Sequence, residues 1–480
     1  MITSDHISLT LDLKQAITTE QAWHYNIIPK SVTTDTITFY ADEELYSPSS
    51  KEELEMLLEK NIQIEKVPTL IIQKTLGKYY LKNTAQKSID KTRKIDVGQP
   101  DDFLKTLIKE AKQLHSSDIH IEVYEQKCRV RIRIDGMLIE RYTISKQEYP
   151  SLINKIKISA TLKIEEKRLP QDGRISFTSE EGKFDIRVSI LPTLYGEKIV
   201  LRLLNNDAAN IDINQLGFSK IELSYFLEGV KKPHGILLIS GPTGSGKTTT
   251  LYATLKLLNK VKSNILTVED PIEYTLEGIN QVQVHEAIGL TFANALRTFL
   301  RQDPDIIMLG EIRDNETAQM AIRAAMTGHL VLSTIHTNSA WGTVSRLSDM
   351  GVPPFLIAST LNTTAAQRLV RLLCPHCKKQ EAFDQAWYPR VYKAPENITE
   401  HYTAQGCENC HHTGYKGRKA IYEVIPVDFE LAEHMKKGST NIDQYLKQKG
   451  IMTLAENAFN LFKNGDTSID EVYPILSNMN

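Results

Sequence analysis

A glycine-rich loop near the middle of the chain places the strongest constraint on its fold. The loop, GPTGSGKT, runs over residues 241–248, follows the apolar run of residues 236–239 and precedes a helix-like stretch at 249–258. Strand, glycine loop and helix in this order form a phosphate-binding P-loop, because glycines let backbone N–H groups curl around phosphate oxygens at a helix N-terminus. The sequence therefore predicts an α/β domain that binds a nucleoside triphosphate.

The residues of this loop are assigned to the nucleotide by the chemistry of phosphate and metal binding. Lys247 can reach the β- and γ-phosphates, and the hydroxyl of Thr248 can bind Mg²⁺. The helix adds a partial positive charge at its N-terminus. A glycine-rich turn without a ligand is the alternative, which the strand–loop–helix order disfavours. The candidate nucleotide-binding residues are Gly241, Pro242, Thr243, Gly244, Ser245, Gly246, Lys247, Thr248 and Thr249.

Length and composition limit the class of protein. At roughly 150 residues per domain, a chain of 480 residues is expected to form about three domains. The 57 basic and 59 acidic residues nearly balance, which gives no overall attraction to nucleic acid or to an anionic membrane. No apolar run approaches the roughly 20 residues that span a bilayer, and the first residues lack the charged-then-apolar pattern of a signal peptide. We therefore expect a cytosolic protein.

Changes in periodicity along the chain predict several domains. Residues 129–134 alternate arginine with apolar residues, which is typical of a half-buried strand, and Asp135 and Gly136 predict the turn that closes it. From about residue 216 strands and helices alternate, as in a doubly wound core. The expected boundaries are 1–85 for a small N-terminal α/β domain, 86–98 for a polar linker, 99–205 for a second domain, 206–215 for a second linker, 216–372 for the core, 373–424 for a cysteine-rich module and 425–480 for a C-terminal helical region.

A second apolar strand, residues 306–309, is followed by Gly310 and Glu311. Its polar end is expected to face the nucleotide, because ligands of open α/β sheets bind at the carboxyl ends of the strands. In many P-loop enzymes an Asp at the place of Gly310 holds Mg²⁺. Either Glu311 contacts the metal through water, or another acid contributes.

Such acids follow a further apolar strand at residues 265–268. Glu269, Asp270 and Glu273 lie close together in the sequence, and they repel one another unless a metal or arginines neutralise them. Taken alone, this segment would be a solvated acidic turn. The P-loop elsewhere in the chain favours a role at the nucleotide.

A third strand, residues 329–336, ends in His336. A histidine at the carboxyl end of a core strand can touch the γ-phosphate and report whether that phosphate is present. The alternative is a structural histidine with its hydrogen bonds satisfied, and the position of His336 after the third strand in this order favours the site.

Four of the five cysteines form two Cys-x-x-Cys pairs, which predict a structural zinc site. The pairs are 29 residues apart, more than is usual. Three histidines beside them could replace a ligand, a redox pair is another alternative, and disulfides are unfavourable in a reducing cytosol. Cys128 is expected to be a buried thiol. The zinc ligands are Cys374, Cys377, Cys407 and Cys410, and the neighbouring histidines are His376, His411 and His412.

Together these elements resemble the secretion ATPase superfamily, the GspE/PilB-type ATPases of type II secretion and type IV pilus assembly. The resemblance covers nearly the whole chain and is specific from about residue 115 to 424. It rests on a Walker A motif at 241–248, an Asp box at 267–273, a Walker B motif with Gly before Glu at 309–314, a His box at 327–336, N2-domain motifs at 117–122, 131–136, 170–174 and 187–189, and a tetracysteine module at 406–418.

The resemblance implies a fold and a set of catalytic roles. It implies a RecA-like P-loop core, preceded by an α+β, PAS-like N2 domain and carrying a small zinc-binding insertion. In the family, two glutamates position water and Mg²⁺, and two N2 arginines approach the γ-phosphate. The arginines would otherwise be ordinary surface or ion-pair residues. The implied catalytic residues are Glu273, Glu311, Lys247, Arg174, Arg187 and His336.

The resemblance also implies a function and partners. It indicates a cytoplasmic ATPase, recruited peripherally to the inner membrane, that assembles a pseudopilus for type II secretion. Its expected partners are other copies in a homo-hexamer, an inner-membrane platform protein and a docking protein bound by the N-terminal N1 domain, and no nucleic acid. Assembly of a type IV or competence pilus is the main alternative. A DNA-transfer ATPase and a nucleotide sensor without hydrolysis are further ones. ATP, Mg²⁺ and Zn²⁺ are the expected ligands.

Overall fold

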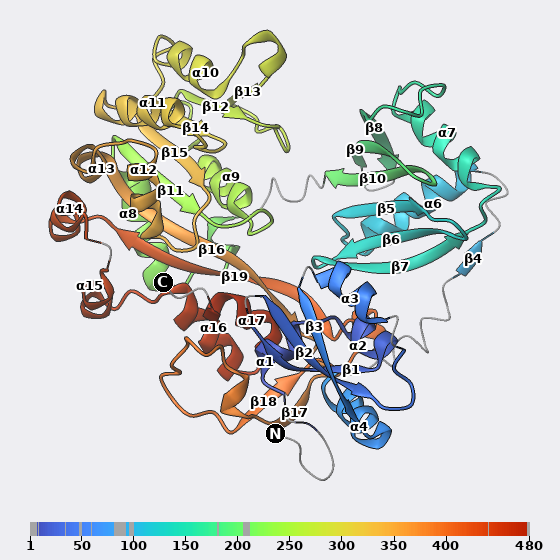
Figure 1. The fold of residues 1–480 in the computed structure, drawn as a ribbon. Coiled ribbons are helices and arrows are strands. Elements are labelled where there is room, and N and C mark those ends of the chain that lie inside the picture. The colour runs from blue at the N-terminus through green and yellow to red at the C-terminus, as the bar shows by residue number, and fades with distance from the viewer. Residues whose placement is uncertain are drawn as a thin grey trace. The chain divides into compact units, whose positions relative to one another are not determined.

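Helices and strands alternate along the chain (Figure 1), which divides into two units, and this confirms the predicted multidomain α/β fold. The computed structural model describes residues 7, 9–33, 35–47, 50–58, 60–80, 93–95, 100–179, 182–204, 212–439 and 441–477. One unit comprises Met1–Thr92, Leu373–Gly414 and Phe462–Asn480, and the other comprises Arg93–Leu372 and Tyr415–Leu461. Of the two predicted linkers, only residues 93–95 and 212–215 are among the described residues.

The P-loop belongs to a seven-stranded sheet in the second unit, with the order β13-β12-β14-β15-β11-β16-β19. Neighbouring strands from β13 to β16 are all parallel. Parallel strands buried on both faces read as continuous apolar runs, and every residue of β11 and β15 is buried. The strands are β11 (Gly235–Ser240), β12 (Ile265–Glu269), β13 (Asn280–Gln283), β14 (Ile306–Leu309), β15 (Leu330–Ile335), β16 (Leu361–Leu373) and β19 (Tyr415–Pro426).

Helices connect these strands and pack on the sheet, with α8 against β19 and α11 against β11 and β15. The helix α9 begins at Lys247, immediately after the P-loop glycines and two residues before the stretch predicted from the sequence. The helices of this part are α8 (Lys220–Lys231), α9 (Lys247–Leu258), α10 (Phe292–Phe299), α11 (Asn315–Met326), α12 (Gly342–Asp349), α13 (Pro354–Thr360), α14 (Phe429–Lys436), α15 (Asp443–Lys449) and α16 (Leu454–Lys463).

A second sheet of seven strands precedes the P-loop sheet in the same unit, with the order β4-β7-β6-β5-β10-β9-β8. Only β4 and β7 pair in parallel, and the other neighbours are antiparallel. The elements are β4 (Arg93–Ile95), α6 (Pro100–Gln113), β5 (Asp118–Val123), β6 (Cys128–Ile134), β7 (Met137–Ile144), α7 (Tyr149–Ser159), β8 (Gln171–Ser179), β9 (Gly182–Thr193) and β10 (Gly196–Leu204).

The strand β6 alternates as the sequence predicts. Cys128 is buried with its apolar neighbours, whereas Arg129 and Arg131 lie on the other face and pair with Glu122 at 2.9 and 2.8 Å. Burial raises the pKa of the Glu122 carboxyl, but its hydrogen bonds to the two arginines outweigh this and bring the pKa to about 2. The arginines therefore stabilise the outer face of this sheet.

The other unit contains the N-terminal domain and the cysteine-rich segment. Its main sheet has the order β1-β2-β3, with β1 and β2 antiparallel and β2 and β3 parallel. The hydroxyl of Tyr473 donates to Asp12, which ties the last helix to the first. The elements are α1 (Leu11–Gln15), α2 (Thr19–Tyr25), β1 (Ile27–Val32), β2 (Thr36–Asp42), α3 (Ser50–Leu58), β3 (Asn61–Val67), α4 (Thr69–Tyr79), β17 (Lys379–Ala382), β18 (Glu400–Thr403) and α17 (Ile469–Ser477).

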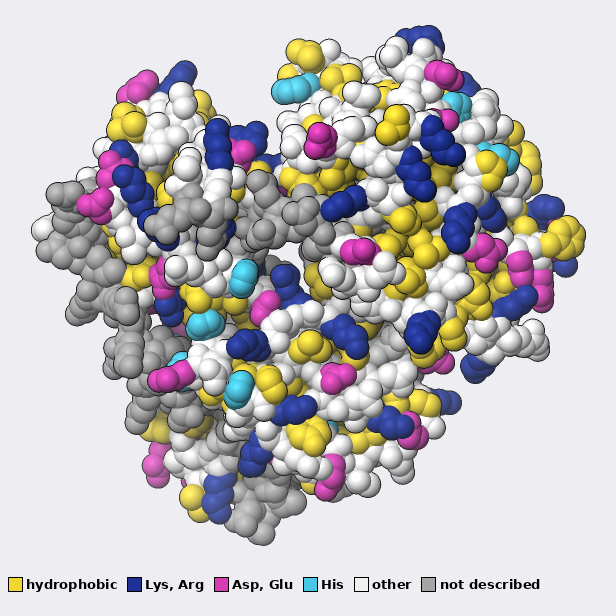
Figure 2. Space-filling view, turned by 180° about the vertical axis from the view of Figure 1, so that it is seen from behind, with side chains coloured by type: hydrophobic (Ala, Val, Ile, Leu, Met, Phe, Trp, Pro, Cys, Tyr) yellow, Lys and Arg dark blue, Asp and Glu magenta, His cyan; other side chains and the backbone are white. Residues whose placement is uncertain are grey.

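Surface composition agrees with the balanced charge of the sequence. On the face seen in Figure 2, Lys and Arg side chains are interspersed with Asp and Glu. Among the helices that the structure describes, none has both the length and the apolar character required to cross a bilayer.

The stability of the sheet formed by β4 to β10, called the antiparallel sheet below, is expected to depend on one buried ion pair. The Lys157 side chain is 0% exposed, and its Nζ lies 2.7 Å from Glu197 Oε1 and donates to the backbone oxygen of Glu166. Removing one partner of a buried pair leaves the other charge uncompensated, which costs about 3–5 kcal/mol. Lys157→Met should lower the free energy of opening of this sheet by about that amount, as measured by amide hydrogen exchange.

Lys155 on the same helix is the matched control. It pairs with Asp101 at 2.6 Å, where both side chains are more exposed to solvent. Exposed pairs contribute about 1 kcal/mol or less. If Lys155→Met and Lys157→Met lower the free energy of opening by the same amount, burial does not explain the contribution of the Lys157–Glu197 pair.

Candidate nucleotide and metal sites

The carboxyl ends of four adjacent parallel strands bring the predicted site residues to one edge of the sheet. The strands β12, β14, β15 and β11 are neighbours in that order. They lead into the acidic segment after Glu269, into Gly310 and Glu311, into His336 and into the P-loop, respectively. The structure therefore places these four strand ends side by side.

The P-loop has a backbone that requires glycine. Gly241 and Gly246 have φ angles of 148° and 88°, in a region that other residues rarely adopt. A Cβ at Gly241 would lie 2.6 Å from the Gln367 oxygen, and one at Gly246 would lie 2.8 Å from Gln367 Nε2. Any side chain at either position would therefore collide with β16.

Polar groups of the loop fit an anionic ligand. Lys247 Nζ donates to the backbone oxygens of Gly241 and Pro242 at 2.8 and 3.0 Å. Burial lowers the pKa of Lys247 to about 8, against the opposing effect of Glu311, so a nearby anion would favour its charged form. The Ser245 hydroxyl is buried and has no hydrogen-bond partner among the described residues. An ammonium and an unsatisfied buried hydroxyl in a glycine loop suit a phosphate group.

Glu311 and His336 lie together beside the P-loop. Glu311 Oε2 is 3.3 Å from His336 Nε2, and its other oxygen pairs with Arg313. Only 15% of the Glu311 side chain is exposed, whereas half of His336 is. The backbone also gives a reason for glycine before Glu311, because a Cβ at Gly310 would lie 3.3 Å from Glu269 Cα on the neighbouring strand.

The three acids at the end of β12 and just after it have different surroundings. Glu269 is buried and accepts hydrogen bonds from Tyr252, from Thr267 Oγ1 at 2.6 Å and from Gln281 Nε2 at 3.1 Å, so its carboxylate is satisfied within the fold. Asp270 lies 3.8 Å from Arg313. Glu273 is partly exposed and remains accessible to a ligand.

The two predicted arginines lie opposite each other on β8 and β9. Arg174 and Arg187 form a cross-strand pair, which places their side chains on the same face of the sheet. Arg187 Nη1 is 2.9 Å from Glu273 Oε2, and the same guanidinium donates to the backbone oxygen of Ile272. Arg174 instead pairs with Asp185 and is largely exposed. Both arginines and Glu273 line one cleft of 740 Å³.

Two polar residues of β16 at the P-loop were missed by the sequence analysis. Arg368 donates to the backbone oxygens of Gln367 and Asn338 at 3.0 and 3.1 Å, and Gln367 Oε1 accepts from Thr250 at 2.9 Å. The signal available was a Gln-Arg pair inside an otherwise apolar run at 365–370. Arg368 brings a second cation of the core close to Lys247 and opposes its protonation.

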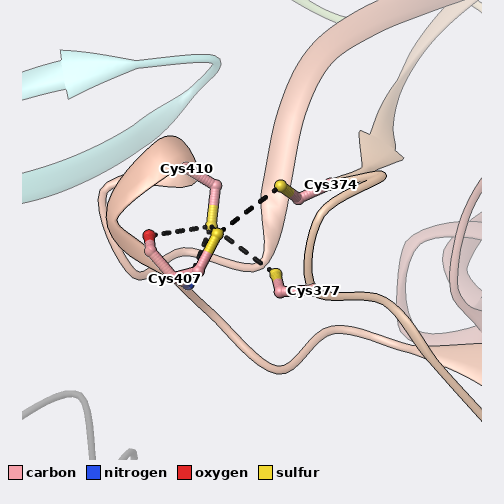
Figure 3. A group of neighbouring side chains, drawn as sticks. All are labelled: Cys374, Cys377, Cys407 and Cys410. Atoms are coloured by element: carbon pink, nitrogen blue, oxygen red, sulfur yellow. Dashed lines mark hydrogen bonds between the residues drawn. The ribbon is translucent and has the colours of Figure 1, made fainter.

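The four paired cysteines converge as the spacing predicts (Figure 3). Their sulfur atoms are 3.9 Å apart for Cys374 and Cys407, 3.8 Å for Cys377 and Cys410, and 3.7 Å for Cys407 and Cys410. A Zn–S bond of about 2.3 Å in a tetrahedron places sulfurs about 3.8 Å apart. These separations fit a four-thiolate metal site and are too long for disulfides.

Backbone groups support this donor set. The amides of Cys407 and Gly414 donate to Cys410 Sγ at 3.1 and 3.3 Å. Within the part of the chain that the structure describes, the metal-binding group consists of the four cysteines and includes none of the neighbouring histidines. Cys128 is buried and free, as predicted.

Comparison with known proteins places the chain in a family. The model of the type II/IV secretion system protein family matches residues 95–474. The type IV pilus assembly ATPase PilB of Myxococcus xanthus is 48% identical, over 76% of this chain and 66% of its own length. The type II secretion system protein E of Pseudomonas aeruginosa is 46% identical, and the type II secretion system ATPase E of Vibrio cholerae is 44% identical. Both alignments cover 77% of this chain and 74% of the relative.

Solved structures have a similar fold. The ATPase DotB of Legionella pneumophila has the same fold over 78% of this chain and 96% of its own, with a TM-score of 0.58 and 21% identity. The pilus retraction motor PilT, solved with bound ADP, matches 77% of this chain and 96% of its own, with a TM-score of 0.52 and 26% identity. The chain therefore belongs to the type II/IV secretion system protein family, the family of these secretion and pilus-assembly ATPases.

Proposed function

We propose that this protein hydrolyses ATP and uses the energy to assemble a pseudopilus for type II protein secretion. The observation that carries the proposal is the meeting of Lys247, Glu311 and His336 at the carboxyl ends of adjacent parallel strands. The names of the relatives 44% and 46% identical to this chain support the type II secretion branch.

Each residue at the strand ends has a proposed task. The P-loop amides and Lys247 hold the β- and γ-phosphates, as such loops do in general. The Thr248 hydroxyl, and Glu311 through water, would hold Mg²⁺, which would supply positive charge to neutralise the phosphates. Glu311 and Glu273 orient the attacking water. His336 contacts the γ-phosphate side of the site and is in turn oriented by Glu311, 3.3 Å away.

Arg187 supplies positive charge from the antiparallel sheet. Its guanidinium is paired with Glu273 at 2.9 Å, and both line the 740 Å³ cleft. A γ-phosphate carries more negative charge than a carboxylate, so its arrival draws Arg187 away from Glu273. This exchange frees Glu273 for water and stabilises charge on the transferred phosphoryl group. Arg174, opposite Arg187 on the neighbouring strand, adds a second charge.

The finer assignments of fold and assembly belong to the same proposal. The P-loop sheet is a RecA-like core, the antiparallel sheet is an N2 domain of PAS-like type, and the cysteine segment is a zinc-binding insertion. Apart from β19, which joins the P-loop sheet and so shortens the cysteine segment, the boundaries are those expected from the sequence. The protein works as a homo-hexamer in the cytoplasm at the inner membrane, with a platform protein and with a docking partner for residues 1–85. No nucleic acid takes part.

Assembly of a type IV pilus is the second candidate, because the Myxococcus xanthus pilus assembly ATPase is 48% identical. Deleting the gene from its host separates the two. Loss of protein secretion with normal surface pili supports the first function, and loss of pili with normal secretion supports the second.

Hydrolysis should depend on Lys247 and Glu311 in different ways. Lys247→Ala removes the cation that holds the phosphates, so both ATP binding and turnover should be lost. Glu311→Gln keeps the shape of the side chain but loses its charge, so turnover should fall about 10²-fold or more while binding persists. Phosphate release and binding of a fluorescent ATP analogue measure the two effects. The control is Lys262→Ala, which changes an exposed lysine. Unchanged phosphate release in Lys247→Ala would exclude this site as the catalytic one.

Arg187→Ala should slow hydrolysis at least tenfold while weakening ATP binding only modestly. The reason is that a positioned arginine stabilises charge that develops in the transition state, an effect worth about 10³-fold or more in other NTPases. Arg141→Ala is the control, because Arg141 lies on β7 and pairs with Glu110. If Arg187→Ala releases phosphate at the rate of Arg141→Ala, the arginine has no part in hydrolysis.

The purified protein should contain one zinc ion per chain, bound by the four cysteines. Zinc in such sites contributes on the order of 10 kcal/mol of binding free energy in small modules, so its loss should unfold the segment around it. Cys377→Ser should remove the metal, as measured by atomic emission, whereas Cys128→Ser should keep it. Metal-free protein from a purification without chelator would contradict the assignment.

A further inference from the structure

Glu423 is a buried carboxylate that the proposed ATP site does not use. It lies on β19, and 4% of its surface is exposed. One carboxylate oxygen, Oε1, accepts the backbone N–H of Ala340 at 2.7 Å, and the other, Oε2, accepts the backbone N–H of Leu454 at 3.1 Å. Burying a carboxylate is unfavourable unless hydrogen bonds compensate. Both oxygens are therefore committed, each to a different segment of the chain.

The first of these segments leads directly from the nucleotide site. Ala340 lies four residues after His336, on the connection between β15 and α12. The same connection is held by Ser240, whose hydroxyl donates to the Ser339 oxygen at 3.2 Å, and by Arg368, which donates to the Asn338 oxygen at 3.1 Å. Ser240 is the last residue before the P-loop. A displacement of His336 or of the P-loop therefore acts on the backbone that Glu423 binds.

The second segment is the first turn of α16. Leu454 is the first residue of this helix, where backbone N–H groups lack partners within the helix. A carboxylate at this end is also favoured by the helix dipole. One turn later, Asn457 donates to the Tyr422 oxygen at 2.7 Å, so the start of α16 is bound to two consecutive residues of β19.

We propose that Glu423 is a positioning residue that couples the connection after His336 to α16, so that nucleotide binding changes the position of that helix. The proposal rests on the proposed function in taking ATP as the ligand. The two oxygens belong to one rigid, planar group, so Ala340 cannot move away alone without leaving a buried oxygen unsatisfied. The helix α16 follows instead.

The first test is Glu423→Gln, which keeps the size of the side chain. The new NH₂ group cannot accept a hydrogen bond, so one of the two links is lost. The kcat for ATP should fall about tenfold, with KM changed less than twofold. Amide exchange of peptides from residues 452–462 should respond to a non-hydrolysable ATP analogue in the wild type, and this response should disappear in the variant.

Glu456→Gln is the matched control, because it makes the same chemical change in the first turn of the same helix. Glu456 is exposed, and among the described residues it accepts the backbone N–H and the hydroxyl of Thr453, bonds that Gln can also accept. This variant should keep both the wild-type kcat and the nucleotide response of α16.

A second pair of variants tests the link from the other side. Leu454→Pro removes the N–H that Glu423 binds, and proline is tolerated in the first turn of a helix. Leu454→Ala loses the same side-chain packing but keeps the N–H. The nucleotide response of α16 should disappear in the Pro variant and persist in the Ala variant, which decides the question even if Glu423→Gln fails to fold.

Two results would overturn the proposal. One is a wild-type α16 whose amide exchange is the same with and without nucleotide. The other is a nucleotide response that survives in Glu423→Gln and in Leu454→Pro. Phosphate release by the wild type tests the proposed function separately, since exchange with bound nucleotide requires no hydrolysis.

Discussion

The parallel pairing of the strands from β13 to β16 is the constraint on which the rest of the site depends. Because neighbouring strands run the same way, segments more than 90 residues apart in the sequence end at one edge of the sheet. A lysine, several acids and a histidine meet there from four separate parts of the sequence. The price of this arrangement is crowding, which is visible at Gly310, where the neighbouring strand leaves little space for a Cβ.

The strand ends were predictable from the sequence because buried parallel strands appear as short apolar runs. The residue that follows each run then lies at the edge of the sheet where the carboxyl ends of the strands meet. Glu311 and His336 were found in this way, the P-loop was found from its glycine pattern, and the paired cysteines were found from their spacing. Arg368 and Glu423 were not. A single polar residue inside an apolar strand carries no periodic signal, and its partners are backbone groups supplied by distant segments. Nor did the sequence indicate that β19 belongs to the P-loop sheet.

Arg187 and Glu273, which both line the cleft, form an ion pair that a ligand would have to break before it could bind to either residue. Arg187 Nη1 lies 2.9 Å from Glu273 Oε2, and both side chains are only partly exposed to solvent. Neither group requires a nucleotide to be electrostatically satisfied. A ligand must therefore compete with an existing ion pair, and only one with a higher charge density than a carboxylate replaces it. Under the proposed function, such competition favours a triphosphate over a diphosphate without any contact to the base.

The cysteine cluster has a consequence for the length of the segment that it encloses. Cys374 follows the last residue of β16, and Cys410 lies five positions before the first residue of β19, while β16 and β19 are neighbours in the sheet. The four sulfurs thus hold together the two ends of the long segment that connects these adjacent strands. Closing a loop costs entropy that grows only with the logarithm of its length, about 0.6 kcal/mol for each doubling. With its ends held together in this way, the enclosed stretch can lengthen or shorten with little effect on the sheet that carries the P-loop.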